Sequence, residues 1–144
     1  VGSEMCIRDS GMTAERFRMD TIAQNIANIN TTRTEDGTPY RRKIVTFAEK
    51  TETPFSQYYE TARARAVGNG VKVTSVKEDD ETEMRMVYDP SHPDADENGY
   101  VTYPNVNTVT EMTNLIDATR AYEANTTAFD ATKSMVQAAL NISK

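Results

Sequence analysis

The sequence contains no tryptophan, one histidine and one cysteine, and these scarcities exclude several classes of site. A disulfide needs two cysteines, and the only one, Cys6, stands near the start of the chain. His92 lies between Ser91 and Pro93, where nothing orients its imidazole as a catalytic base requires. We therefore expect no disulfide, no thiol chemistry and no catalytic triad, and interpret His92 as a loop residue.

Long apolar runs and an excess of positive charge are also missing. No stretch approaches the roughly 20 apolar residues of a membrane-spanning helix. The formal net charge is −6, whereas nucleic-acid binding needs a basic surface that neutralises phosphates. The 144 residues match one ordinary domain, and the sequence shows no phosphate-binding glycine loop or paired carboxylates. We expect no cofactor, no metal, no nucleic acid, no small-molecule substrate and no enzymatic activity.

The opening segment VGSEMCIRDS differs from the rest of the chain. It begins with Val1 instead of a methionine, and it lacks the apolar periodicity that starts at Met12. It also resembles a stray adaptor translation. We expect residues 1–10 to be a non-native segment that replaces part of the first helix.

Helical periodicity is the main pattern that the chain does contain. A heptad seam with spacings of seven, three, four and three runs through Met12, Met19, Ile22, Ile26 and Ile29. It predicts a helix over residues 11–30, which ends before turn signals at Asp36-Gly37. A second heptad frame, from residue 105 to the end, includes Leu115, Ala118, Tyr122, Asn125, Phe129, Thr132, Val136 and Ala139.

The middle of the chain has the period of β-strands. Residues 40–47, 71–76 and 82–89 are rich in β-branched or aromatic residues or alternate apolar with polar ones, which predicts two or three antiparallel strands. Residues 48–67 fit a loop or a short helix equally well. The fold class is mainly α with a small β insert. Residues 11–32 and 105–144 would form a discontinuous coiled-coil domain of two paired helices, and residues 33–104 a β-rich insert between them.

Three charged stretches have two interpretations each. Asp94, Asp96, Asn98 and Gly99 fit the first half of a calcium-binding EF-hand loop, but the twelfth position is asparagine instead of glutamate. An acidic turn is the better interpretation. The basic run 41–43 is typical of edge-strand protection, and the acidic run 78–83 of a solvated loop. Alternatively, the two runs attract each other between adjacent subunits.

Several blocks of the sequence resemble a known family. DTIAQNIANINTT is similar to the N-terminal signature of flagellar rod and hook proteins. TPYRRK, YDPSHPDADENGYV and PNVNTVTEMTNLIDATRAYEANTTAFDATKSM narrow the resemblance to flagellar basal-body rod proteins of the proximal rod. The resemblance covers nearly everything from residue 11 to residue 144, and residues 49–70 are its least distinctive part.

The resemblance implies a structural subunit of the bacterial flagellar basal body. Such proteins are exported by the flagellar type III apparatus to the periplasmic rod. There they polymerise with copies of themselves and other rod proteins into a helical tube that transmits torque from the motor to the distal rod and hook. Their terminal helices pair as an inner coiled-coil layer, with the β insert outside. The alternative is a soluble coiled-coil adaptor that binds one partner helix.

Asparagines interrupt the end of the first helix, although they are poor helix formers. We predict that Asn25, Asn28 and Asn30 hydrogen-bond to neighbouring subunits; the alternative for the last two is that they cap a fraying helix end. The predicted assembly interface consists of Ile22, Asn25, Ile26, Asn28, Ile29, Met112, Leu115, Ile116, Tyr122, Asn125 and Phe129.

Overall fold

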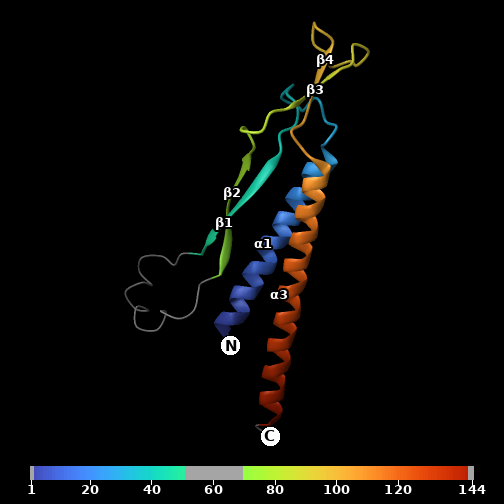
Figure 1. The fold of residues 1–144 in the computed structure, drawn as a ribbon. Helices are drawn as coiled ribbons and strands as arrows, with labels where there is room; N and C mark the ends of the chain where they lie inside the picture. The colour runs from blue at the N-terminus through green and yellow to red at the C-terminus, as the bar shows by residue number, and fades with distance from the viewer. Residues whose placement is uncertain (1, 51–69, 143–144) are drawn as a thin grey trace, which may run out of the picture.

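The computed structural model describes residues 2–50 and 70–142 and is mainly helical, with a small β part. Its elements, in chain order, are α1 (Gly2–Ala27), β1 (Lys43–Glu49), β2 (Val71–Glu78), β3 (Arg85–Tyr88), β4 (Tyr100–Tyr103) and α3 (Thr108–Ile142). Figure 1 shows an elongated molecule in which the two helices lie side by side. The first pair of strands runs along α1, and the second pair projects from the opposite end to the chain termini (Figure 1). Neither of these helices combines the length and apolarity that a membrane crossing requires.

The helices α1 and α3 are antiparallel, as their contacts establish. The Thr119 hydroxyl donates to the sulfur of Met19, and the Thr126 hydroxyl to the sulfur of Met12, both over 3.5 Å. The residue numbers of each pair add to 138, so the numbers decrease along α1 in the direction in which they increase along α3. With 35 residues against 26, α3 extends beyond the start of α1, and its last turns have no helical neighbour within the described part of the chain (Figure 1).

The predicted helix boundaries differ from the structure by nine residues at the start of α1 and by three residues at its end and at the start of α3. The structure places residues 2–10 in α1, and α1 ends at Ala27 instead of residue 30. The chain then turns, with the Thr31 amide donating to the Asn28 carbonyl over 3.1 Å. Asparagine competes for such local hydrogen bonds, which explains why the helix ends early despite the apolar rhythm. At the other end, α3 begins three residues after the predicted position because Asn107 caps it.

The strands form two separate antiparallel pairs. In the first, β1 pairs with β2 from Lys43 opposite Glu78 to Glu49 opposite Val71, with a register shift after Thr46. Therefore β1 begins three residues later than predicted and includes residues 48 and 49 of the segment that the sequence left ambiguous. Residues 51–67 of that segment lie outside the described residues.

The second pair, β3 with β4, contains a strand that the sequence analysis missed. The residues of β4 were interpreted as part of an acidic turn, but they pair with β3 from Tyr100 opposite Tyr88 to Tyr103 opposite Arg85. Asp96 makes the turn, because its Oδ1 accepts hydrogen bonds from the amides of Asn98 and Tyr100. The acidic block therefore closes a hairpin.

Few apolar side chains are buried within the described residues. They are Ala14, Ile22, Tyr40, Val101 and Ala118. The buried polar side chains are at least as many, namely Thr21, Asn25, Asp79, Asn105, Glu111 and Thr132. Four of these polar residues gather where α1, β1 and α3 meet, so hydrogen bonds contribute much of the specificity of this junction.

Candidate functional site

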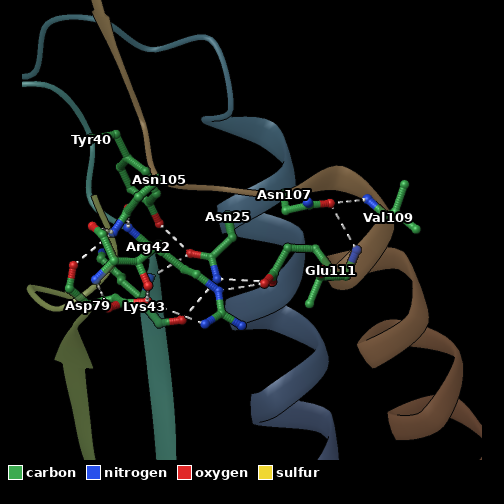
Figure 2. A network of polar contacts seen from close by, with 11 residues as sticks. Asn25, Tyr40, Arg42, Lys43, Asp79, Asn105, Asn107, Val109 and Glu111 are labelled. Carbon is green, nitrogen blue, oxygen red and sulfur yellow. Dashed lines mark hydrogen bonds and ion pairs between the residues drawn. The ribbon is translucent and has the colours of Figure 1, made fainter. Parts of the chain in front are cut away.

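Asn25 lies at the centre of the junction and uses its whole hydrogen-bonding capacity there (Figure 2). Its side-chain amide donates to the Lys43 carbonyl over 2.9 Å and to Glu111 Oε2 over 3.2 Å. Its oxygen accepts from the Lys43 amide and from the Tyr40 hydroxyl, each over 2.9 Å. An asparagine side chain has two donor hydrogens and two acceptor lone pairs, so none is unused. By bonding both backbone groups of Lys43, Asn25 substitutes for a neighbouring strand where β1 begins.

Glu111 brings the start of α3 into the same network. It is only 1% exposed, and its Oε1 accepts from Arg42 Nε over 2.7 Å while Oε2 accepts from Asn25. A buried carboxylate is costly unless it is paired and hydrogen-bonded, and both conditions are met here. Glu111 also lies in the first turn of α3, where a negative charge interacts favourably with the helix dipole.

Asn105 and Asp79 continue the network to the end of β2. Asn105 accepts from the Arg42 amide over 2.8 Å and donates to the carbonyls of Asp79 and Thr82. Asp79 accepts from the amide and hydroxyl of Thr82 and lies 3.6 Å from Arg42. The hydrogen bonds from Thr82, followed by those of Glu81 and the charge of Arg42, hold the pKa of Asp79 below its usual 3.8.

Two further groups complete the junction. Burial, and then the negative charges of Glu111 and Glu78, raises the pKa of the Tyr40 hydroxyl above its usual 10.0. Tyr40 is therefore neutral at physiological pH and donates its proton to Asn25. The side-chain oxygen of Asn107 accepts from the amides of Val109 and Thr110, which caps α3 (Figure 2). These contacts fix α1, the start of β1, the end of β2 and α3 relative to one another. They provide no catalytic group arrangement.

The residues predicted for assembly fall into three groups. Ile22 and Asn25 are buried inside the chain. Seven others are half-buried, namely Ile26, Asn28, Ile29, Leu115, Tyr122, Asn125 and Phe129. Met112 and Ile116 are 51% and 53% exposed. The Asn28 side chain bonds within its own helix end, to the Gln24 carbonyl and the Thr31 hydroxyl, as a capping residue does.

The opposite charged runs meet within one chain, whereas the alternative interpretation paired them between adjacent subunits. Arg41 contacts Asp80 at 2.7 Å, and Arg42 contacts Asp79 and Glu111. The cause is the pairing of β1 with β2, which places the residues before one strand beside those after the other.

The acidic loop uses its carboxylates for the chain itself. Asp94 accepts from the Thr32 hydroxyl over 2.8 Å and lies 3.8 Å from Arg33, while Asp96 makes the hairpin turn. His92 accepts from the Asp94 amide in this loop. Over residues 2–50 and 70–142, no cluster of three acidic, histidine or cysteine side chains is placed to hold a metal ion.

Sequence reasoning missed Tyr40, Arg42, Asn105 and Glu111 as members of one network. The chain separations are long: Asn25 and Glu111 are 86 residues apart, and Arg42 and Glu111 are 69 apart. One signal was available. Glu111 interrupts the apolar face of a helix beside Asn107, and a charge at a core-facing position needs a partner from elsewhere.

The comparisons with known proteins match this architecture. The family described as "Flagella basal body rod protein" matches residues 7–33, which contain most of α1 and its end. The family described as "Flagellar basal body rod FlgEFG protein C-terminal" matches residues 97–142, which contain β4 and α3. The flagellar basal-body rod protein FlgC of Borreliella burgdorferi is 43% identical, covering 97% of this chain and 95% of the relative.

Two further relatives agree over nearly the whole length. The FlgC protein of Bacillus subtilis is 45% identical over 94% of this chain and 93% of its own. That of Aquifex aeolicus is 38% identical over 91% and 88%. The chain belongs to the FlgC family of flagellar basal-body rod proteins. As a FlgC-family member it is a structural subunit of the flagellar basal-body rod and not an enzyme.

Proposed function

We propose that this FlgC-family chain forms part of the proximal rod, a helical tube that transmits torque from the motor to the distal rod and hook. It would assemble there with copies of itself and with other rod proteins. The observation that carries the proposal is the similarity to FlgC proteins over more than nine-tenths of the chain. Rigid transmission needs subunits whose parts do not shift, and the saturated network around Asn25 supplies such a joint.

The two helices would form one discontinuous coiled-coil unit, residues 11–32 and 105–144, on the inside of the tube. Residues 33–104 would form the β-rich insert on the outside. The long contact between α1 and α3 supports this division, as does the position of both hairpins away from the free face of α3 (Figure 1). The buried apolar set is too small to stabilise two long helices well, which favours further burial against neighbours.

The predicted interface residues then divide by role. Met112 and Ile116, with the half-buried residues beside the seam, would contact neighbouring subunits. Ile22 and Asn25 would act indirectly, because they hold α1 against β1 and α3. Export through the flagellar type III apparatus in an unfolded state is compatible with a chain that has one cysteine and few large buried apolar groups.

The experiment is replacement of FlgC in Bacillus subtilis by this chain, followed by motility assays and purification of basal bodies. We expect the chain to copurify with basal bodies. A matched control is the same replacement with the Asn25→Leu variant, which should reach the periplasm less stably folded and restore less motility. Wild-type chain that is exported and folded but absent from purified basal bodies would contradict the proposal.

A further inference from the structure

The hairpin of β3 and β4 presents an exposed apolar face at one end of the molecule (Figure 1). Tyr88 lies opposite Tyr100, and Met86 is on the same face because side chains alternate along a strand. Tyr88, Tyr100 and Met86 are 64%, 42% and 61% exposed, and the two tyrosine rings meet edge to face with their centroids 5.2 Å apart. Large apolar side chains that are this exposed on a hairpin of only two strands are typical of a contact surface.

A cleft of about 370 Å³ lies beside this face. Its lining includes Arg33 from the loop that follows α1, Asp94 and Asp96 from the loop before β4, and Tyr100 itself. Asp94 lies 3.8 Å from Arg33, which offsets one negative charge. Residues 88–100 nevertheless contain four acidic residues and no lysine or arginine. This end of the molecule is therefore both apolar and negative.

The end of α3 has the complementary properties. Met135, Leu140 and Ile142 are each at least 65% exposed, and α3 extends here beyond the start of α1 (Figure 1). From residue 131 onwards the sequence contains two lysines, at positions 133 and 144, and no acidic residue. This end of the molecule is therefore apolar and positive, and opposite charges favour its contact with the hairpin end.

Subunits that follow one another in the same orientation along the long axis bring these unlike ends together. The hairpin projects past the helices at one end, and α3 projects past α1 at the other, so two stacked chains would overlap along the two projections (Figure 1). The axial repeat would be about 50 Å, since the 35 residues of α3 rise about 1.5 Å each. A contact between unlike ends does not close into a dimer and continues along the axis.

We propose that the hairpin of β3 and β4, with the cleft beside it, receives the apolar and basic end of the C-terminal helix of the next rod subunit along the axis. The match of residues 97–142 to the C-terminal family named for FlgEFG supports this occupant, because it indicates that rod subunits other than FlgC carry a helix of the same type. The proposal rests on the proposed function, since it names a contact that assembly into the rod would use.

A photo-cross-linking side chain tests the contact in assembled rods. The chain replaces FlgC in Bacillus subtilis with benzoylphenylalanine in place of Tyr100, and basal bodies are purified after irradiation. We expect an adduct whose attachment point, mapped by mass spectrometry, lies in the last turns of the C-terminal helix of a rod protein. The matched control carries benzoylphenylalanine in place of Phe17, which is 41% exposed against 42% for Tyr100 but lies in the middle of α1. It should form no adduct with such a helix end.

Substitutions on the hairpin supply a second readout. Met86→Ser combined with Tyr88→Ser removes exposed apolar surface, so it should lower incorporation into basal bodies about tenfold. The circular dichroism spectrum of the purified chain should not change, because neither side chain is buried. Tyr88→Phe keeps the aromatic ring and should leave incorporation unchanged. So should the matched control Val76→Ser, which removes an exposed apolar side chain from β2 instead.

The outcomes separate this inference from the proposed function. Basal bodies that contain the chain without an adduct from position 100, or with that adduct mapped to any other element, would overturn the inference and leave the proposed function standing. Full incorporation of the double serine variant would do the same. Absence of the wild-type chain from basal bodies would remove the proposed function and this inference together.

Discussion

At the scale of single residues, the tertiary structure depends on a few side chains whose polar groups are completely used. Asn25 shows this most clearly, because one buried amide on α1 bonds both to the strand β1 and to the helix at the other end of the sequence (Figure 2). An unsatisfied buried polar group costs about 1–3 kcal/mol, so each partner of Asn25 matters when the amide is removed.

Replacing Asn25 by leucine should lower the free energy of unfolding by about 3 kcal/mol or more, because it leaves Lys43, Tyr40 and Glu111 with unpaired polar groups. Urea unfolding followed by circular dichroism measures the change. Asn28→Leu is the matched control. Asn28 is less buried and bonds only locally, so its loss should cost about 1 kcal/mol or less. Equal losses for the two variants would contradict the central role of Asn25.

Gly70 offers a second test at this scale, because the cost of a positive φ can be separated from the cost of a close contact with an added Cβ. Its φ is +88°, and an added Cβ would lie 2.3 Å from the Ser10 hydroxyl oxygen, which accepts from the Val71 amide. Gly37 has a similar φ of +78° with nothing within 4 Å. Gly37→Ala should therefore cost only the backbone term, about 1–2 kcal/mol, and Gly70→Ala more.

The thermal unfolding midpoints of the two glycine variants provide the comparison. Adding Ser10→Ala to Gly70→Ala should recover part of the loss, because it removes the clashing oxygen. If Gly37→Ala and Gly70→Ala were equally destabilising, the close approach of α1 to the start of β2 would have no energetic weight.

At the scale of elements, the turn after β2 depends on an ionised carboxylate. The folded chain holds the pKa of Asp79 below its usual 3.8, chiefly through hydrogen bonds from Thr82. A carboxyl group whose pKa is lower in the folded state stabilises the fold above its unfolded pKa. That contribution disappears as the pH falls through the folded value.

Stability should therefore decline as the pH falls below about 3.8, and Asp79→Asn should reduce this decline because it removes the titrating group. The measurement is the unfolding midpoint as a function of pH for both proteins. Asp80→Asn is a suitable control, since Asp80 is exposed and pairs only with Arg41. A wild-type profile that the Asp79 substitution leaves unchanged would contradict this assignment.

Elements were predicted from sequence to different degrees for identifiable reasons. Both helices were found because long apolar periodicity is a repeated local signal. The end of α1 and the start of α3 were misplaced because capping by asparagines competes there with the apolar pattern. β4 was missed because four residues give little periodicity and their partner, β3, lies across an acidic turn. The network of Asn25, Arg42 and Glu111 was missed because hydrogen bonds between distant residues leave no periodic trace.

At the scale of the whole molecule, the chain is a long pair of helices with strands along one side and at one end (Figure 1). The last turns of α3 extend past α1, and Met135, Leu140 and Ile142 are 65%, 65% and 86% exposed. Side chains this exposed contribute little to the stability of a single chain. Their apolar character fits contact with neighbours instead.

A chain that ends after Ala139 should unfold within about 0.5 kcal/mol of the full chain, because the side chains of Leu140, Asn141 and Ile142 are exposed. Its incorporation into basal bodies should fall, since apolar surface available to neighbours is lost. Guanidinium unfolding and quantitation of purified basal bodies measure the two effects. Loss of fold stability together with unchanged incorporation would reverse this assignment of roles to the end of α3.

The sequence by itself determined the family, the two helices and the small β part, because these follow from local periodicity and from motifs read residue by residue. Only the tertiary structure decided which polar residues meet. Asn25 and Arg42 both bond to Glu111, and the basic run contacts the acidic run that follows β2. The physical reason is that a buried hydrogen bond depends on distance and direction in space. Those are set when antiparallel helices and paired strands bring together positions that are far apart along the chain.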